Sequence, residues 1–266
     1  MNLYLNDKSK IDLLVALFQL LKNCSNYVKF EFYLDHIKIQ GMDKSQICLF
    51  FTNIQSNWFT QYLNNEYIEI LIESNSLFLI LSKMQENQTL FMQYNKIEEM
   101  LDINVLTNLI IENSILNSKL KKSEFNFYYQ IPLLNIEQES FKIPDIDYEA
   151  EFSINSKHMS DLFIHLGLFG NELNINCNEN EILFETNGEI GKIKVAVVLE
   201  DLNEFSINEG EQINLAFSLH HLLKMSLSTK LAKNIDVSLS NNYPIRIKYD
   251  LGQESYCLFY IAPKIF

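Results

Sequence analysis

The side chains of this 266-residue sequence that could carry out chemistry are four cysteines and five histidines. The cysteines are far apart, each in an apolar or strand-like stretch, and none shows the Cys-x-x-Cys or Cys/His spacing of a zinc site. They are Cys24, Cys48, Cys177 and Cys257. His158, His165, His220 and His221 fall in predicted helices without metal ligands at a suitable spacing. We expect reduced core thiols, histidines on helix surfaces, and no metal site.

Catalytic motifs do not occur in the sequence either. It has no glycine-rich phosphate loop, no nucleophile elbow and no Cys/His pair with an orienting acid. Paired carboxylates such as Glu98 and Glu99 are typical of an ordinary solvated surface. We therefore expect a protein that is not an enzyme, needs no cofactor, and acts by binding.

Size and charge limit the partners that such a protein can bind. Hydrophobic residues make up 47% and aromatic residues 12% of the chain, enough for one large domain or two of ordinary size. A formal net charge of −13 repels phosphates, so any contact with DNA must be concentrated on a local basic face. Since no segment reaches the roughly 18 apolar residues of a membrane span or resembles a signal peptide, we expect an intracellular protein.

A connector just past the middle of the chain, residues 138–148, separates two halves. Pro144 lacks an amide donor and forces Ile143 into an extended conformation, so regular structure is disfavoured here. Phe141, Ile143 and Ile146 offer apolar groups, whereas most of the charges in and around the segment are acidic. The pattern predicts an extended strap that crosses other elements, with a solvated linker as the alternative.

The pattern of the half that precedes the connector predicts a unit of strands and helices. Apolar residues at helical spacing predict a helix at 8–22, capped by Asp7 or Ser9, and a second helix at 75–84 that would also suit a buried strand. Alternating residues predict strands at 27–34, 37–40, 46–54, 67–72, 88–93, 97–106 and 125–131. The pattern weakens over residues 107–122, where we expect a loop or a strand extension.

The half that follows the connector repeats this order. Helices are predicted at 155–167 and 218–226. Strands are predicted at 149–154, 173–177, 182–186, 190–198, 205–207, 212–217, 235–239, 245–250 and 256–261. The sequence therefore predicts a duplicated α+β unit, with domains at 1–134 and 149–266 joined by a connector at 135–148.

Three stretches carry a more specific pattern. The first is residues 37–49 (IKIQGMDKSQICL), followed by Phe59, and the second is residues 187–191 (NGEIG). The third is residues 258–265 (LFYIAPKI), preceded by residues 242–245 (NYPI) and 215–219 (LAFSL). Together with the duplicated order of elements, these stretches resemble the proliferating cell nuclear antigen family of DNA sliding clamps. The resemblance covers essentially the whole chain except residues 107–122.

The resemblance implies two similar clamp domains per chain, with antiparallel sheets outside and four helices inside. Three chains would form a ring around duplex DNA and hold it topologically, so that processivity needs little affinity. The implied partners are duplex DNA of any sequence, DNA polymerase and other replication or repair proteins that carry a short peptide, a clamp loader, and further copies of the chain. The implied location is the nucleus, or the viral replication compartment if the source is a large DNA virus.

In the family, the partner peptide is a one-turn helix with one aliphatic and two aromatic anchors, which inserts under the connector. Positions that match this pocket are Met42, Gln46, Ile47, Phe141, Ile143, Pro144, Pro244, Tyr260, Ala262 and Pro263. An apolar pocket with a few backbone groups at its rim suits such a peptide. Gln46 stands where many relatives carry histidine, and the connector looks two residues longer at Glu139 and Ser140. The alternative is that Met42, Ile47 and Tyr260 only pack the sheet.

The family lines its hole with basic residues that contact phosphates without reading the sequence. Matching or compensating positions here are Lys8, Lys10, Lys22, Lys83, Lys157, His220, Lys224 and Lys230. Five helix positions that usually are basic hold Val15, Ala16, Leu79, Asp161 and Ile164. The basic cluster Lys119, Lys121 and Lys122 is either a solvated charge run or a further DNA contact.

Subunits of the family join through edge strands. The matching edge in the second half includes Lys192, Ile193, Lys194, Val195 and Ala196, and the candidate edges in the first half are residues 119–127 or 101–109. The sparse lysines on the helices and the poor match of the first-half edge leave an alternative function open. This is a clamp-fold scaffold, a transcription factor, or one subunit of a mixed checkpoint-type ring that does not encircle DNA as a homotrimer.

Overall fold

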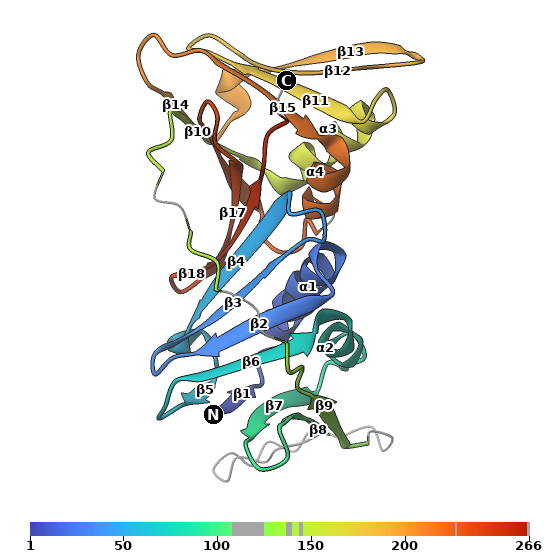
Figure 1. The fold of residues 1–266 in the computed structure, drawn as a ribbon, viewed down its shortest axis with the longest axis vertical. Helices are drawn as coiled ribbons and strands as arrows, with labels where there is room; N and C mark the ends of the chain where they lie inside the picture. The colour runs from blue at the N-terminus through green and yellow to red at the C-terminus, as the bar shows by residue number, and fades with distance from the viewer. Residues whose placement is uncertain (108–124, 137–139, 144–145, 227, 265–266) are drawn as a thin grey trace.

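The computed structural model describes residues 1–107, 125–136, 140–143, 146–226 and 228–264 of the chain. The first half contains β1 (Asn2–Leu5), α1 (Lys8–Cys24), β2 (Tyr27–Phe32), β3 (His36–Met42), β4 (Cys48–Gln55), η1 (Ser56–Trp58), β5 (Gln61–Leu63), β6 (Ile68–Glu73), α2 (Ser74–Leu81), β7 (Gln88–Asn95), β8 (Met100–Thr107) and β9 (Phe127–Pro132). The second half contains β10 (Ala150–Asn155), α3 (Ser156–Gly167), β11 (Glu172–Cys177), β12 (Ile182–Gly188), β13 (Gly191–Val197), η2 (Leu199–Asp201), β14 (Glu204–Ile207), β15 (Ile213–Ser218), α4 (Leu219–Ser226), β16 (Asn234–Leu239), β17 (Ile245–Gly252) and β18 (Ser255–Ile261). Figure 1 shows these elements stacked along an elongated molecule.

One nine-stranded antiparallel sheet joins the two halves, in the order β14-β10-β16-β17-β18-β4-β3-β2-β6. The halves meet where β18 pairs with β4, with Tyr260 opposite Leu49 and Tyr256 opposite Asn53. Two smaller sheets lie toward the ends of the molecule (Figure 1), a five-stranded one in the order β5-β1-β7-β8-β9 and a four-stranded one in the order β13-β12-β11-β15. Because they share this sheet, the two halves have a fixed relative orientation.

The longer helices begin at side-chain caps. The carboxylate of Asp7 accepts the amides of Ser9 and Lys10 at the start of α1, and the side chain of Asn155 caps α3 in the same way. Each helix then buries one apolar stripe, which on α1 includes Ile11, Leu14, Leu17, Phe18 and Leu21.

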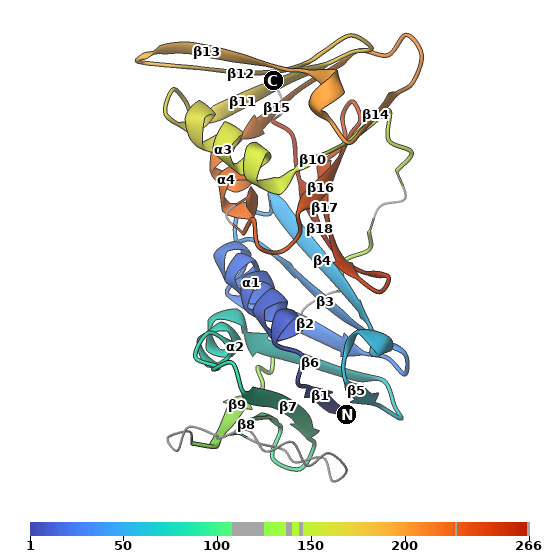
Figure 2. The same cartoon turned by 180° about the vertical axis from the view of Figure 1, so that it is seen from behind.

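The four helices form one side of the molecule, as Figure 2 shows from behind. α1 packs against α2 and α3 packs against α4, while α1 also contacts α4 where the halves meet. The connector crosses the opposite face of the nine-stranded sheet, called the outer face below. The fold is therefore a duplicated clamp fold with helices on one side and antiparallel sheets on the other.

All four predicted helices are confirmed, and the strand alternative for the second is wrong because residues 74–81 form α2. β1 and β5, of 4 and 3 residues, were not predicted, because segments this short show a weak period, although the four-residue β14 was predicted at 205–207. The strand predicted at 97–106 begins at Met100, because residues 96–99 form the turn after β7. The edge predicted at 101–109 is wrong as well, since β8 pairs with β7 on one side and β9 on the other.

Candidate functional site

The first half of the connector is held to the outer face by a buried polar cluster. Ser140 Oγ donates to Glu31 Oε1 at 3.0 Å and accepts from Lys29 Nζ at 2.8 Å. The amide of Phe141 donates to Gln40 Oε1 at 3.0 Å, and Gln40 Nε2 donates to Glu31 Oε1 at 2.7 Å. Lys29, Glu31 and Gln40 are buried although they point away from the main core. Their hydrogen bonds offset the cost of burial and fix the path of the connector.

The middle and the end of the connector use different contacts. Ile143 packs on a small apolar cluster of the outer face formed by Phe51, Leu258 and Tyr260. Further along, the Tyr148 ring lies 4.5 Å from the guanidinium of Arg246, the single arginine of the chain. Arg246 is itself held by Glu151 at 2.6 Å. The described residues of the connector thus touch the sheet at three separate places.

The loop between β3 and β4, residues 43–47, is called the pocket loop here. Asp43 Oδ1 accepts the amides of Ile47 at 2.8 Å and Cys48 at 2.7 Å, which closes the loop on itself. The carbonyl of Ile47 accepts the amide of Ala262 at 2.9 Å, so the loop is joined to the end of β18. These bonds bring the first-half and second-half members of the predicted pocket together.

The predicted pocket residues differ in exposure. Gln46 is exposed and has a φ of 58°, a left-handed conformation that is uncommon outside glycine. Tyr260 is only 5% exposed beneath the connector, and this burial raises the pKa of its hydroxyl. The partly exposed members are Met42, Ile47, Phe141, Ile143, Pro244, Ala262 and Pro263. Pro144 lies outside the described residues.

Several lysines predicted to face DNA make contacts within the chain instead. Lys10 Nζ donates to the Trp58 carbonyl at 2.6 Å and to Gln253 Oε1 at 3.0 Å. Lys22 Nζ lies 3.8 Å from the centre of the Phe78 ring, and Lys8 pairs with Asp12 at 2.7 Å. Because these lysines already have partners within the chain, they are less available to contact DNA phosphates.

Other basic groups on the helix side remain available. Lys83, Lys157, His220 and Lys230 are exposed, and Lys224 is partly buried. Burial, Lys224 and His221 lower the pKa of His220, so its ring is neutral at neutral pH and adds little positive charge. Leu79 and Ile164, which stand where relatives are basic, are exposed apolar groups. The basic cluster predicted at 119–122 lies outside the described residues.

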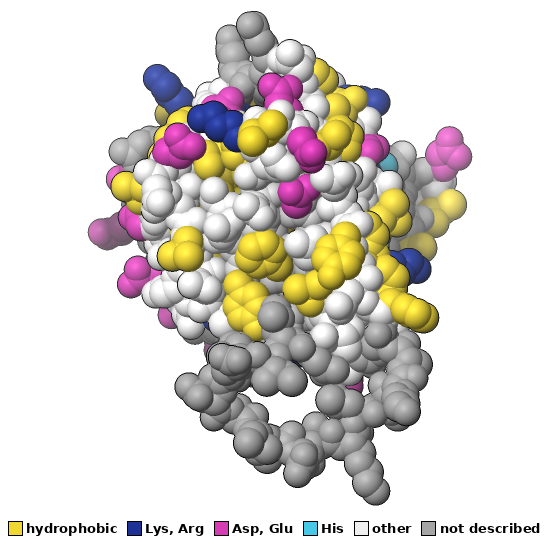
Figure 3. Space-filling view, turned by 90° about the horizontal axis from the view of Figure 1, so that it is seen from below, with side chains coloured by type: hydrophobic (Ala, Val, Ile, Leu, Met, Phe, Trp, Pro, Cys, Tyr) yellow, Lys and Arg dark blue, Asp and Glu magenta, His cyan; other side chains and the backbone are white. Residues whose placement is uncertain are grey.

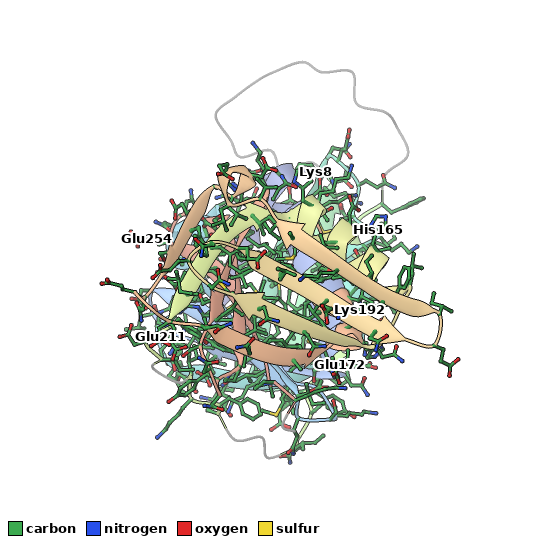
Figure 4. All side chains as sticks on the ribbon, turned by 90° about the horizontal axis from the view of Figure 1, so that it is seen from above. Lys8, His165, Glu172, Lys192, Glu211 and Glu254 are labelled. Atoms are coloured by element: carbon green, nitrogen blue, oxygen red, sulfur yellow. The ribbon has the colours of Figure 1, made fainter. Side chains whose placement is uncertain are left out.

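Within the residues that the structure describes, β13 and β9 each pair with one neighbour only and leave the other edge open. Along β13, Lys192, Lys194 and Ala196 are exposed while Ile193 and Val195 are partly buried. Figure 4 shows Lys192 at this end of the molecule, where its Nζ pairs with Glu185 at 2.5 Å. An open edge of this kind is a template for a strand of another chain.

The β9 edge is aromatic. Tyr128 is 70% exposed, and the rings of Phe127 and Tyr129 stack 6.1 Å apart. Gln130 bonds to Glu98 and Asp102, which bring acidic groups to this edge. Figure 3 views the molecule from this end and shows hydrophobic side chains gathered at the surface. Exposed aromatic groups on an open edge indicate an interface.

Other kinds of site find no support in the described part of the chain. No three His, Cys, Asp or Glu side chains there lie close enough together to hold a metal ion. The four cysteines are buried free thiols. None of the described helices is long and apolar enough to cross a membrane.

Two similar domains that share a sheet, with four helices on one face and a connector across the other, define the class of DNA sliding clamps. The family models for the N-terminal and C-terminal domains of proliferating cell nuclear antigen match residues 7–140 and 142–264. The chain therefore belongs to the proliferating cell nuclear antigen family.

Relatives of this chain match nearly end to end. It is 27% identical to proliferating cell nuclear antigen 2 of Plasmodium falciparum over 94% of both chains. It is 28% identical to proliferating cell nuclear antigen of Chaetomium thermophilum over 86% of this chain and 85% of the relative. It is 21% identical to the DNA polymerase sliding clamp of Pyrococcus furiosus over 87% of this chain and 86% of the relative.

Proposed function

We propose that this protein is a ring-shaped processivity factor in which three copies encircle duplex DNA. The observation that carries the proposal is the pair of open edges at β9 and β13. If β9 of one copy pairs with β13 of the next, a five-stranded and a four-stranded sheet combine into nine strands. The sheet that joins the two domains within a chain also has nine strands. The junction between chains would then resemble the junction between domains, as a closed ring requires.

Charge and exposed aromatic groups support this pairing. Lys192, Ile193, Lys194, Val195 and Ala196 would meet the β9 edge, where Glu98 and Asp102 are acidic. Opposite charges across an interface select the register and partner. The exposed aromatic groups of β9 would be buried by the neighbouring chain.

The pocket beneath the connector would take the partner peptide of DNA polymerase and of other replication and repair proteins. Its described members would be Met42, Gln46, Ile47, Phe141, Ile143, Pro244, Tyr260, Ala262 and Pro263. The hydrogen bonds that hold the connector and the pocket loop support this assignment, because segments that are already ordered lose less conformational freedom when a peptide binds. Ile47→Ala combined with Tyr260→Ala should abolish peptide binding while the ring persists.

DNA would pass along the helix side and meet a few exposed basic groups among the residues that the structure describes. Exposed Lys83, Lys157 and Lys230 would give weak contacts that depend strongly on salt, so retention would rest on the closed ring. Such a ring needs a clamp loader to open it. The relatives above are cellular and carry the word nuclear in two of their names, which supports the nucleus over a viral compartment.

Retention on DNA tests the proposal. After loading, the protein should stay on closed circular DNA and leave after the circle is cut. Equal loss from circles and linear DNA would contradict encirclement.

A second function is favoured by the helix side itself. Leu79 and Ile164 are exposed and apolar, and Lys10 and Lys22 are engaged within the chain. These features suit a clamp-fold scaffold, a transcription factor, or a subunit of a mixed checkpoint-type ring. A protein that stays monomeric alone and never stays on circles would support this reading.

A further inference from the structure

Asp43 of the pocket loop and His221 of α4 connect the two domains at the proposed pocket. Asp43 Oδ2 lies 3.1 Å from His221 Nε2. Ser45 Oγ lies 3.3 Å from the same nitrogen and donates to the Asp43 carboxylate. Because an ionised carboxylate only accepts hydrogen bonds, the histidine ring donates from Nε2. The side chains of Asp43 and His221 are each 12% exposed, so this contact is shielded from water.

The other oxygen of the same carboxylate organises the pocket loop. Asp43 Oδ1 accepts the amides of Ile47 and Cys48, and the Ile47 carbonyl accepts the amide of Ala262. A chain of hydrogen bonds therefore runs from His221 through Asp43 to Ile47 and Ala262. The last two residues are members of the proposed pocket, whereas His221 is not.

The conformation of the pocket loop needs such support. Gln46 has a φ of 58°, in the left-handed region that a residue with a side chain adopts at a cost. On the histidine side, Nδ1 of His221 is buried and has no hydrogen-bond partner among the described residues. Within the described part of the chain, the hydrogen bonds of this mostly buried ring are thus made to the pocket loop alone.

We propose that His221 is a positioning residue, which supports binding of the partner peptide without contacting the peptide. It holds the pocket loop against α4, so that Ile47 and the end of β18 already have the arrangement that binds the peptide. The inference rests on the proposed pocket. It also makes the second domain responsible for the shape of a loop that belongs to the first.

The test compares three variants of the full-length protein with a labelled synthetic peptide that carries one aliphatic and two aromatic anchors on one helical turn. His221→Ala should weaken peptide affinity about tenfold, the scale of one lost hydrogen bond to a charged group. His221→Gln should recover most of that loss, because its amide can still donate to Asp43. His158→Ala is the control, since this histidine is exposed on α3, away from the pocket loop, and its affinity should be unchanged.

Amide hydrogen exchange supplies a readout that a general loss of stability would not reproduce. In His221→Ala the amides of Ile47 and Cys48 should exchange faster while those of β11 and β12 keep their protection. Wild-type affinity together with unchanged exchange at Ile47 and Cys48 would overturn the inference. A wild-type protein that binds no peptide would overturn the proposed pocket instead, and the role of His221 in holding the loop would then be decided by exchange alone.

Discussion

The amide of Phe141 donates a hydrogen bond to the side-chain oxygen of Gln40 at 3.0 Å, across 101 residues of sequence. The side-chain nitrogen Nε2 of Gln40 in turn donates a hydrogen bond to Glu31 Oε1 at 2.7 Å. The connector is therefore held by side chains of β2 and β3 as well as by its own apolar residues. A connector fixed in this way can form the roof of a pocket.

Gln40→Ala should lower the free energy of unfolding by about 1 to 3 kcal/mol, because it removes one partner of the buried Glu31 and leaves the Phe141 amide unpaired. Urea titration measures the change. Gln93→Ala is the control, since Gln93 is an exposed glutamine of β7, and it should have almost no effect. Equal stability of the two variants would show that the cluster does not hold the connector.

Stability should fall in acid partly through Asp43. Burial alone would raise the pKa of this carboxyl, but hydrogen bonds from Ser45, Cys48, Ile47 and His221 outweigh it and lower the pKa below 3.8. A lowered pKa stabilises the folded state above the unfolded value, and that stabilisation is lost as the pH falls through the folded value.

Asp43→Asn should remove this contribution, so its unfolding free energy should change less than that of the wild type as the pH falls below about 5. Chemical denaturation between pH 7 and the acid limit of folding measures the two slopes. Asp161→Asn serves as the control, because Asp161 is exposed on α3 and should leave the wild-type slope unchanged. Parallel curves for Asp43→Asn and the wild type would contradict the prediction.

Tyr128→Asp should disrupt the ring without unfolding the chain. Tyr128 is 70% exposed in the single chain, so an acidic residue costs little there until β13 of a neighbour covers it. Light scattering should show a shift toward monomer, with an unchanged circular dichroism spectrum. Tyr243→Asp, at an exposed turn of the second half, should keep the wild-type mass. A wild-type mass for Tyr128→Asp would remove β9 from the interface.

Lys157→Ala should reduce the salt dependence of DNA contact by about one unit of slope for each Lys157 that meets a phosphate. Lys157 is exposed at the start of α3 on the helix side. Binding to short duplex DNA over a range of salt concentrations measures the slope. Lys142→Ala, on the connector and the opposite face, is the control. Should both variants give the wild-type slope, Lys157 does not face DNA.

The sequence predicted the elements that carry a clear period. Four helices and the duplicated order follow from apolar stripes such as Ile11, Leu14 and Phe18. The pocket members were predicted only through the family resemblance, and whether they bind a peptide stays a prediction.

The residues that support the candidate pocket could not be predicted in the same way. Lys29, Glu31 and Gln40 look like a solvated strand face, because the segment that buries them lies about a hundred residues away in the chain. His221 was predicted at a helix surface, yet its ring is mostly buried against Asp43. Local patterns report neighbours in sequence, whereas these contacts depend on the tertiary fold.

The mass of the purified protein in solution shows whether three chains assemble into a ring. If three chains close a ring, the protein should form one species at three times the chain mass of 31.2 kDa, at concentrations where the ring is assembled. Multi-angle light scattering across a dilution series gives this value without assumptions about shape. A mass of a single chain at every concentration would contradict the homotrimeric ring.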